Sequence, residues 1–407
     1  MTCYEFGCRA FQKIAAFGRM LWFWKNPKLL RGSGCAGELP ALIKSLGLRR
    51  VLLVTDPGLV ELGLPAPLIR GLEEEGIFCA VYGRTRANPS AEEIEAALRL
   101  YREEKCRAVI AFGGGSPMDC AKMAAYCAAP PARKPQRIRG IQAVPLRKPP
   151  KVFAVPTTAG TGSEVTIAAV VTDPRTHEKC SVLSPLLCPK YAALDPLLSV
   201  SLPPDLTGQT GMDALTHAVE AYISRGSTKK TDAWALQAVK LIFANLETAY
   251  ADGGDVAARD AMLYAAYCAG AAFTRAYVGY AHSIAHALGG LYDLPHGLSC
   301  AVALPTVLAA YGEAAHARLA DLYDAADLPA SSQSNAEKAA GFIAAIRQMN
   351  ARMQIPEGFD CIKAEDIPQI AARAVKEGNP LYPVPKIMRR PACEDVIRSL
   401  MRDDDRL

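Results

Sequence analysis

The chain has 407 residues, of which 50% are hydrophobic and 21% charged, and its formal net charge is +5. This length favours two domains, the composition is that of a globular protein, and the small charge without a basic stripe argues against a nucleic-acid partner. The thirteen cysteines are an odd number and include no Cys-x-x-Cys pair, which favours free thiols in a reducing, cytoplasmic setting over a disulfide framework.

Residues 1–30 form an apolar N-terminal extension. Arg9, Lys13, Arg19 and Lys25 interrupt it, so no uncharged run is long enough to span a membrane. The extension also lacks the order of charge, apolar run and cleavage site that defines a signal peptide. We therefore expect no integral membrane segment. Two interpretations stay open, a helix on a membrane surface and an amphipathic flap packed on the protein or a neighbouring subunit, and the flap is preferred.

Predicted strands and helices alternate through residues 31–202. The strand segments are short, apolar and rich in β-branched residues, whereas the segments between them carry a helical period. Such alternation predicts a Rossmann-like domain with a parallel sheet. Strands are expected at 49–56, 78–84, 107–113 and 151–156, and helices at 59–76, 90–106 and 117–128.

From residue 203 onward the pattern changes. Ala- and Leu-rich segments of 3.6-residue period, such as 231–250 and 259–274, replace the β-branched runs. This periodicity predicts an all-helical domain over 203–407, with the Pro203–Pro204 pair as the hinge before it.

A glycine-rich turn, "GGGSP" (113–117), follows one predicted strand and opens a predicted helix. Glycines let a bulky anion approach the backbone closely, and the positive end of a helix binds a pyrophosphate. Ser116 is expected to cap the helix, with Pro117 in its first turn and Asp119 completing a capping box. The alternative is a Gly-rich turn that binds nothing.

Two further features favour a nucleotide site. Asp56, at the end of a predicted strand, can accept hydrogen bonds from an adenosine ribose and would repel a 2′-phosphate, which favours NAD over NADP. It precedes the glycines, which are not spaced as G-x-G-x-x-G, so a variant site is predicted; the alternative is an ordinary turn residue. A second loop after a strand, 156–166, is rich in hydroxyls, and its alternative role is a crossover between strands. Together the two loops favour a nucleotide-binding cleft.

Four of the six histidines fall in two short segments, "GMDALTHAVEAY" (211–222) and "AHSIAHALGGLYDLPHG" (281–297). The acidic residue and histidine of the first segment are four apart, and so are the first two histidines of the second, so each pair shares one helix face. One carboxylate with three imidazoles suits iron or zinc rather than calcium or magnesium. Five candidates exceed four ligands, so one histidine is expected to contact substrate or transfer protons. The candidates are Asp213, His217, His282, His286 and His296.

With these motifs the sequence resembles the iron-dependent (group III) alcohol dehydrogenases, from about residue 30 onward. The segments that carry the resemblance are "GGGSPMDCAK", "PTTAGTGSEVT" and the two histidine segments, in the family's order and spacing. The resemblance implies a dehydroquinate synthase-like architecture, with a cleft between an α/β and a helical domain, and commonly a homodimer.

The resemblance also implies roles for individual residues. The metal, Fe(II) with zinc as the alternative, would be held by Asp213, His217, His282 and His296. His286 would lie beside the substrate without binding the metal, and Phe273 near the substrate and the nicotinamide. Contacts to NAD would come from Asp56, Asn88, Gly113, Gly114, Gly115, Ser116, Pro117, Thr157, Thr158, Thr161 and Lys179.

The predicted function is metal-dependent hydride transfer between NAD(H) and a small primary alcohol or aldehyde. Ala168 stands where some diol-oxidising relatives carry a polar residue, so the resemblance does not extend to diol specificity. One alternative is a zinc-dependent polyol dehydrogenase or a lyase on the same fold. The other is a non-catalytic scaffold subunit, although a scaffold would not need all five metal-site residues.

Overall fold

The computed structural model describes residues 2–20, 24–129, 134–142, 148–172, 179–329 and 334–402. The chain divides into two compact units, which are described separately. One, the sheet unit, comprises Phe23–Leu202 and Gly253–Tyr267; the other, the helical unit, comprises Met1–Trp22, Pro203–Asp252 and Cys268–Leu407.

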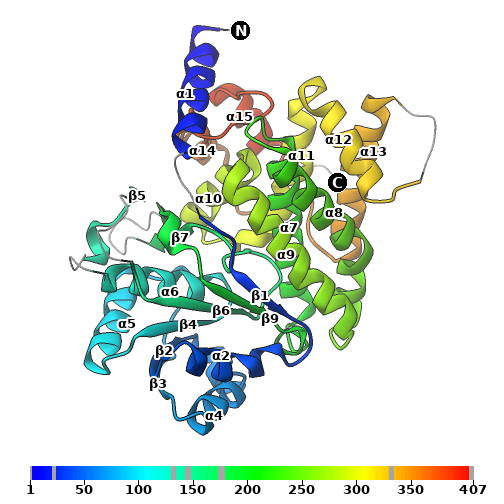
Figure 1. Cartoon of the computed structure of the whole chain (residues 1–407). Helices are drawn as coiled ribbons and strands as arrows, with labels where there is room; N and C mark the ends of the chain where they lie inside the picture. The colour runs from blue at the N-terminus through cyan, green and yellow to red at the C-terminus, as the bar shows by residue number, and fades with distance from the viewer. Residues whose placement is uncertain are drawn as a thin grey trace. The chain divides into compact units, whose positions relative to one another are not determined.

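A six-stranded sheet forms the centre of the sheet unit (Figure 1). Its order is β1-β9-β6-β4-β2-β3, and every neighbouring pair is parallel, which confirms the predicted α/β class. The inner strands are apolar on both faces because helices cover both sides. The strands are β1 (Lys28–Arg31), β2 (Arg50–Val54), β3 (Phe78–Tyr82), β4 (Ala108–Gly113), β6 (Lys151–Pro156) and β9 (Tyr191–Leu194).

Helices pack on both faces of this sheet (Figure 1). On one face the apolar sides of α5 (Ala91–Glu103) and α6 (Gly115–Ala128) bury a core that includes Ile94 and Met123. On the other face, α2 (Leu39–Ser45) and α4 (Ala66–Glu74) contribute Ile43 and Leu72. Because the sheet is sandwiched, its strand ends have fixed positions from which loops can present functional groups.

The direction of chain progression reverses between β2 and β4. From β2 the chain adds β3 on one side, then returns to add β4, β6 and β9 on the other. In open α/β sheets, ligands bind at the carboxyl ends of the strands that flank such a reversal. The turn into α3 (Pro57–Glu61) and the glycine turn into α6 both start there. A smaller sheet of β5 (Gly140–Ile141), β8 (Lys179–Leu183) and β7 (Ala168–Thr172) lies in the same unit.

The helical unit confirms the predicted helical C-terminal region. Within its described residues after Pro203, the one ladder contact is the isolated bridge between Phe359 and Met401. Asp293, in the left-handed conformation, ends one helix, and Pro295 precedes the next. The helices are α7 (Pro204–Ile223), α8 (Lys229–Ala251), α9 (Val256–Ala276, whose first half belongs to the sheet unit), α10 (Tyr280–Tyr292), α11 (His296–Tyr311), α12 (Glu313–Ala325), α13 (Asn335–Arg352), α14 (Ile367–Gly378) and α15 (Arg390–Arg398).

The N-terminal helix α1 (Cys3–Met20) belongs to the helical unit. The Arg9 guanidinium donates to the carbonyls of Val384 and Pro385. The Gln12 amide donates to the carbonyls of Pro380 and Tyr382. Across the described part of the chain, no helix is both long and apolar enough to cross a membrane.

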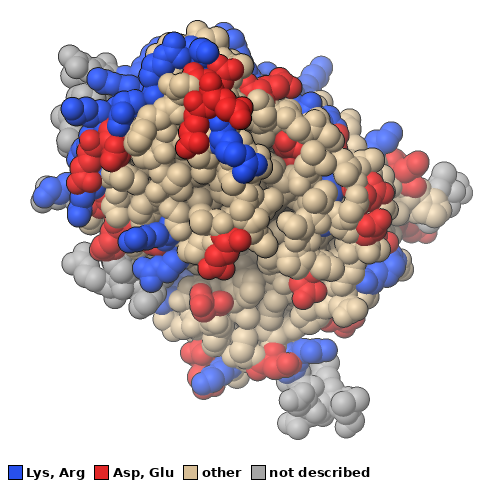
Figure 2. Space-filling model, turned by 90° about the horizontal axis from the view of Figure 1, so that it is seen from below, with Lys and Arg blue, Asp and Glu red and all other residues tan. Residues whose placement is uncertain are grey.

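The charged side chains of both signs are mixed on the surface drawn in Figure 2. Lysine and arginine alternate with aspartate and glutamate around a largely uncharged middle. No continuous basic track of the kind that follows a nucleic-acid backbone crosses the described residues on this face.

Candidate functional site

Three helices of the helical unit carry the predicted metal residues. Asp213 and His217 lie one turn apart on α7, His282 lies in the first turn of α10, and His296 is the first residue of α11. Asp213 and His282 are each only 2% exposed. A buried carboxylate surrounded by imidazoles is rare in a protein interior, because buried ionisable groups need a partner of opposite charge or a metal.

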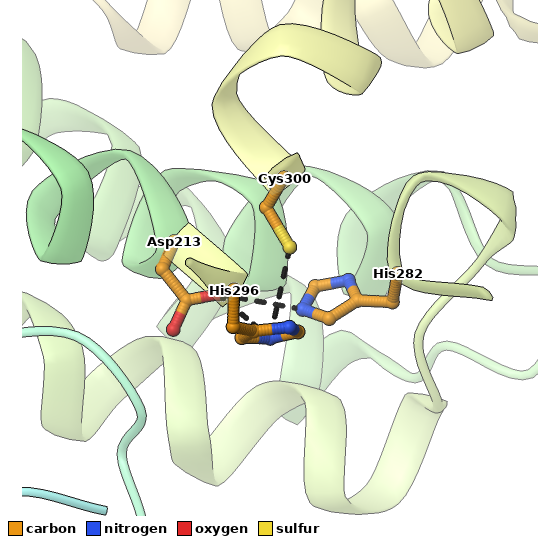
Figure 3. Close-up of side chains that lie close together, drawn as sticks. All are labelled: Asp213, His282, His296 and Cys300. Carbon is orange, nitrogen blue, oxygen red and sulfur yellow. Dashed lines mark hydrogen bonds and ion pairs between the residues drawn. The ribbon is translucent and has the colours of Figure 1, made fainter. Parts of the chain in front are cut away.

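Four donor side chains converge in this interior (Figure 3). Asp213 Oδ1 lies 3.4 Å from His296 Nε2 and 3.7 Å from His282 Nε2. The Cys300 thiol, one turn beyond His296 on α11, lies 3.7 Å from His296 Nε2. One atom from each of these residues lies within 4.8 Å of all the others. We call Asp213, His282, His296 and Cys300 the donor cluster.

The buried donor atoms fit a divalent cation. Asp213 Oδ1, His217 Nδ1 and His282 Nε2 are buried and have no hydrogen-bond partner. An unsatisfied buried polar atom costs about 1–3 kcal/mol, and more when it is charged. One acidic oxygen and two imidazole nitrogens without partners are explained by a cation, which would accept lone pairs from all three. The oxygen and nitrogen donors are those that iron and zinc prefer.

The proton affinities of the cluster follow from its charges. Burial acts to raise the pKa of Asp213, but the charges of His217 and His296 outweigh it and hold that pKa well below its ordinary value. Burial lowers the pKa of His217 to about 3. For His296, the negative charges of Cys300 and Asp213 outweigh burial and raise the pKa to about 10. The negative groups therefore stabilise a proton on His296, and a bound metal would supply positive charge in its place.

Glu220, one further turn along α7, orients His282. Its Oε2 accepts a hydrogen bond from His282 Nδ1 at 2.6 Å, and both side chains are buried. The same carboxylate accepts from the backbone amides of Gly279 and Ala281 at the start of α10. Because Nδ1 is used in this bond, Nε2 points its lone pair into the donor cluster. A carboxylate behind a metal-binding histidine is a common means of fixing the ring and its tautomer.

His286 lies one turn beyond His282 and has a different partner. Its Nδ1 is hydrogen-bonded to Glu377 Oε1 at 2.7 Å, and Tyr382 Oη donates a hydrogen bond to the same oxygen. Burial acts to raise the pKa of Glu377, but His286 outweighs it and holds that pKa below its ordinary value. The His286 ring stacks on that of His296 at 5.1 Å, and its side chain is 25% exposed. His286 therefore sits beside the donor cluster with access to solvent.

His217 and Phe273 lie on the other side of His282. The His217 ring stacks on His282 at 4.3 Å and on Phe273 at 4.1 Å. His217 Nδ1 is 3.9 Å from Asp213 Oδ1. The structure thus brings His217 next to the carboxylate, although its nitrogens are not among the four atoms of the donor cluster.

Close backbone approach lets α11 reach α7. A Cβ on Gly297, the residue after His296, would lie 2.5 Å from the carbonyl oxygen of Gln209 on α7. Any side chain there would push the first turn of α11 away. The glycine therefore sets how near His296 comes to Asp213.

In the sheet unit, the two predicted loops pack against each other at the ends of β4 and β6. Gly113 has a φ of +140°, which favours glycine, and a Cβ on Gly115 would lie 2.9 Å from Thr161 Cγ2. A Cβ on Gly114 would meet Thr158 Oγ1 at 3.3 Å, and Thr157 N donates to the Gly113 carbonyl. These contacts hold the two loops as one surface at the point where the sheet reverses.

The predicted capping box at Ser116 is wrong. The N-cap of α6 is Gly114, and no side chain caps it. Because the chain turns at Gly113, the helix starts early enough that Ser116 is already inside it, where its hydroxyl accepts from Asn88 N. Asp119 instead accepts from Ser163 Oγ and from a backbone amide. The first amides of α6 are thus free of a side-chain cap, as an anion site requires.

A buried charge network lies behind these loops. Lys122 Nζ donates to the carbonyl and hydroxyl of Ser163 and to Thr166 Oγ1, each at 3.0 Å. Burial raises the pKa of Glu164 to about 7. Lys122 is 1% exposed, so its bonds tie the second loop firmly to α6.

The remaining predicted nucleotide contacts are spread around the same strand ends. Asp56 Oδ1 accepts from Leu59 N and caps α3, so one of its oxygens has a structural role. Asn88, at φ +55°, approaches the glycine turn through its bond to Ser116. Pro117 packs under Gly113, within 2.8 Å of where a Cβ would stand. The backbone of Lys179 pairs with Thr172, and its side chain lies outside the described residues.

Sequence reasoning missed three residues that touch the predicted histidines. Cys300 follows His296 by four residues, and Glu220 follows His217 by three, so helical spacing carried a signal for both. Glu377 lies 91 residues from His286 in the chain, and no local pattern connects the two. A carboxylate on a helix is common, so its spacing alone gives no reason to select it.

Comparisons with known proteins show what the whole chain is similar to. The family "Iron-containing alcohol dehydrogenase" matches residues 26–196, and "Fe-containing alcohol dehydrogenase family, C-terminal" matches 207–401. The chain is 37% identical over 357 residues to NAD-dependent methanol dehydrogenase of Bacillus methanolicus, covering 87% of this chain and 93% of that protein. It is 40% identical over 339 residues to 1,3-propanediol dehydrogenase of Klebsiella pneumoniae, covering 82% and 87%. A solved 1,3-propanediol oxidoreductase superposes with a TM-score of 0.89 at 36% identity, covering 93% of this chain and all of that one.

Proposed function

This chain belongs to the iron-containing alcohol dehydrogenase family and is an NAD-dependent alcohol dehydrogenase, and we propose that it acts at a ferrous centre. There it interconverts small primary alcohols and aldehydes. The family membership and the NAD-dependent dehydrogenase activity predicted from the motifs are confirmed. The identity of the metal, the preferred alcohol and the roles of individual residues form the proposal.

One observation carries the proposal: Asp213 Oδ1 and His282 Nε2 are buried, lack hydrogen-bond partners and lie 3.7 Å apart. We assign the metal to Asp213, His217, His282 and His296. A divalent cation there supplies Lewis acidity toward an alcohol or aldehyde oxygen. Asp213 neutralises part of its charge, and Glu220 holds the His282 ring with Nε2 facing the site.

His286 is assigned to move the alcohol proton. Its bond to Glu377 keeps the hydrogen on Nδ1, so Nε2 is free to take the hydroxyl proton of an alcohol. The partial exposure of His286 lets that proton pass to solvent. In aldehyde reduction the same nitrogen returns a proton to the product oxygen. We assign to the Phe273 ring the role of an apolar wall that limits water near the reacting carbon.

The two loops of the sheet unit are assigned to the nucleotide. NAD⁺ bound there supplies the hydride acceptor. The amides of Gly115 and Ser116, at a helix end that no side chain caps, would hold the pyrophosphate. Thr157, Thr158 and Thr161 would contribute hydroxyls, and Asp56 would bind the adenosine ribose. Asn88, Gly113, Gly114, Pro117 and Lys179 complete the assigned contacts.

We also propose that the enzyme is a cytoplasmic homodimer. The thirteen cysteines are an odd number and include no Cys-x-x-Cys pair, which suits a reducing compartment. Light scattering on the purified protein tests the dimer, and a mass corresponding to one chain of 43.5 kDa would contradict it.

The test is an anaerobic activity screen. Protein stripped of metal is loaded with Fe(II) or zinc, and NADH absorbance is followed with short primary alcohols, diols, polyols and aldehydes. The proposal predicts the highest turnover with iron and short primary alcohols or aldehydes. Faster turnover of polyols by the zinc form would favour the zinc-dependent polyol dehydrogenase instead. A metal-loaded protein that turns over none of these substrates would favour the scaffold.

A further inference from the structure

Cys300 has a buried thiol to which the sequence analysis assigned no role. It lies on α11 and is completely buried. It is one turn after His296, so both side chains emerge from the same face of the helix. Its sulfur points into the same space as His296, Asp213 and His282 (Figure 3).

Three of the separations within the donor cluster match those between ligands of a single ion. Four ligands arranged tetrahedrally at about 2.0–2.3 Å from one ion lie about 3.3–3.7 Å from one another. The separations are 3.4 Å from Asp213 Oδ1 to His296 Nε2 and 3.7 Å from Asp213 Oδ1 to His282 Nε2. The separation from His296 Nε2 to the Cys300 sulfur is 3.7 Å. The sulfur thus stands at a ligand's distance from His296 Nε2 and within 4.8 Å of the donor atoms of Asp213 and His282.

A second observation indicates that the space between the donor-cluster atoms binds a cation. Asp213 Oδ1 and His282 Nε2 are aimed into it, are 2% exposed as residues, and have no hydrogen-bond partner. These two atoms come from α7 and α10, whereas the thiol comes from α11. Two buried atoms without a hydrogen-bond partner, beside a thiol from a third helix, are the expected surroundings of an ion.

We propose that Cys300 binds the catalytic cation as a thiolate, in addition to the carboxylate and imidazoles. This inference rests on the metal centre proposed above and adds a sulfur donor to it. The thiol releases one proton to solvent when the metal binds. A soft sulfur ligand favours zinc and cobalt over manganese, which prefers oxygen donors. Cys300 is therefore a determinant of which metal this enzyme retains.

Cobalt(II) is the probe, because cobalt bound to a thiolate gives an intense sulfur-to-metal charge-transfer absorption in the near ultraviolet. The full-length protein, stripped of metal, is titrated with cobalt, and Cys300→Ala, Cys300→Ser and Cys393→Ala are titrated in parallel. Cys393 is a matched control because it is equally buried but lies on α15, outside the donor cluster. Circular dichroism confirms that each variant is folded, and Cys300→Ser, the closer isostere, replaces Cys300→Ala if the alanine variant does not fold.

The proposal predicts a charge-transfer band in the parent and in Cys393→Ala that both Cys300 variants lack. It also predicts that zinc affinity falls more than about tenfold in Cys300→Ala, whereas manganese affinity changes less. Weak visible cobalt bands in the parent without charge transfer would overturn the thiolate ligand and leave the metal centre intact. A parent protein that binds no cobalt would overturn both.

Discussion

Replacing Glu220 by glutamine tests whether His282 is held as a metal ligand. The two carboxylate oxygens accept hydrogen bonds from three donors: Oε2 accepts from His282 Nδ1 and Gly279 N, and Oε1 accepts from Ala281 N. Glutamine has the same shape but one oxygen and no charge. Whichever way the amide turns, it presents its NH₂ to at least one buried N–H and weakens the orientation of His282.

The magnitude follows from these contacts. An unsatisfied buried N–H lowers the free energy of unfolding by about 1–3 kcal/mol. Loss of a carboxylate behind a metal-binding histidine lowers metal affinity by about 10- to 100-fold, or about 1.4–2.7 kcal/mol. Both effects apply nearly in full because Glu220 and His282 are each 2% exposed, so water does not screen their interaction.

The assay is competition for Fe(II) or zinc against a chelator of known affinity, with urea unfolding measured on the same samples. Glu247→Gln makes the same chemical change on the exposed side of α8, where Glu247 pairs with Arg352. The control is expected to keep full metal affinity and to lose less than about 1 kcal/mol of stability. If Glu220→Gln binds metal as tightly as the parent, His282 is not oriented by Glu220 as a ligand and the reasoning fails.

Three further outcomes are expected. His286→Ala should retain the metal, by elemental analysis, while turnover falls about 100-fold or more; loss of the metal would mean that the ligand and the proton-transfer residue were exchanged. Gly297→Ala should lower metal affinity in the chelator assay, because a Cβ meets the Gln209 carbonyl and moves His296; unchanged affinity would show that α11 adjusts without cost. The pKa of Glu164 is about 7 in the folded chain and 4.5 ordinarily, so between these pH values the folded chain holds a proton that the unfolded chain has lost. The free energy of unfolding should therefore fall by about 3 kcal/mol as pH rises from 4 to 8. In urea unfolding, Glu164→Gln should remove this pH dependence.

The sequence predicted the elements of the site better than their contacts. Helical spacing placed Asp213 with His217, and the small number of histidines made the second segment stand out. Spacing within one helix says nothing of the partner helix, so the bonds to Glu220 and Glu377 had to come from the structure. Cys300 was hidden among thirteen cysteines, and the other twelve lie outside the donor cluster.

The error at Ser116 has a backbone cause. A serine before proline, with an acidic residue three positions later, satisfies the pattern of a capping box. The pattern cannot show that Gly113 takes a positive φ and starts the helix two residues sooner. Once the helix starts there, Ser116 and Asp119 are free to bind Asn88 and Ser163 instead. The same turn leaves the amides of the helix open to an anion.

The most direct measurement is an anomalous difference map from crystals of the protein loaded anaerobically with Fe(II), collected at the iron absorption edge. We predict one peak per chain, at bonding distance from Asp213 Oδ1, from a ring nitrogen of His217 and from Nε2 of His282 and His296. Enzyme that oxidises alcohols in the same crystals with no peak there, or with its iron bound elsewhere, would contradict it.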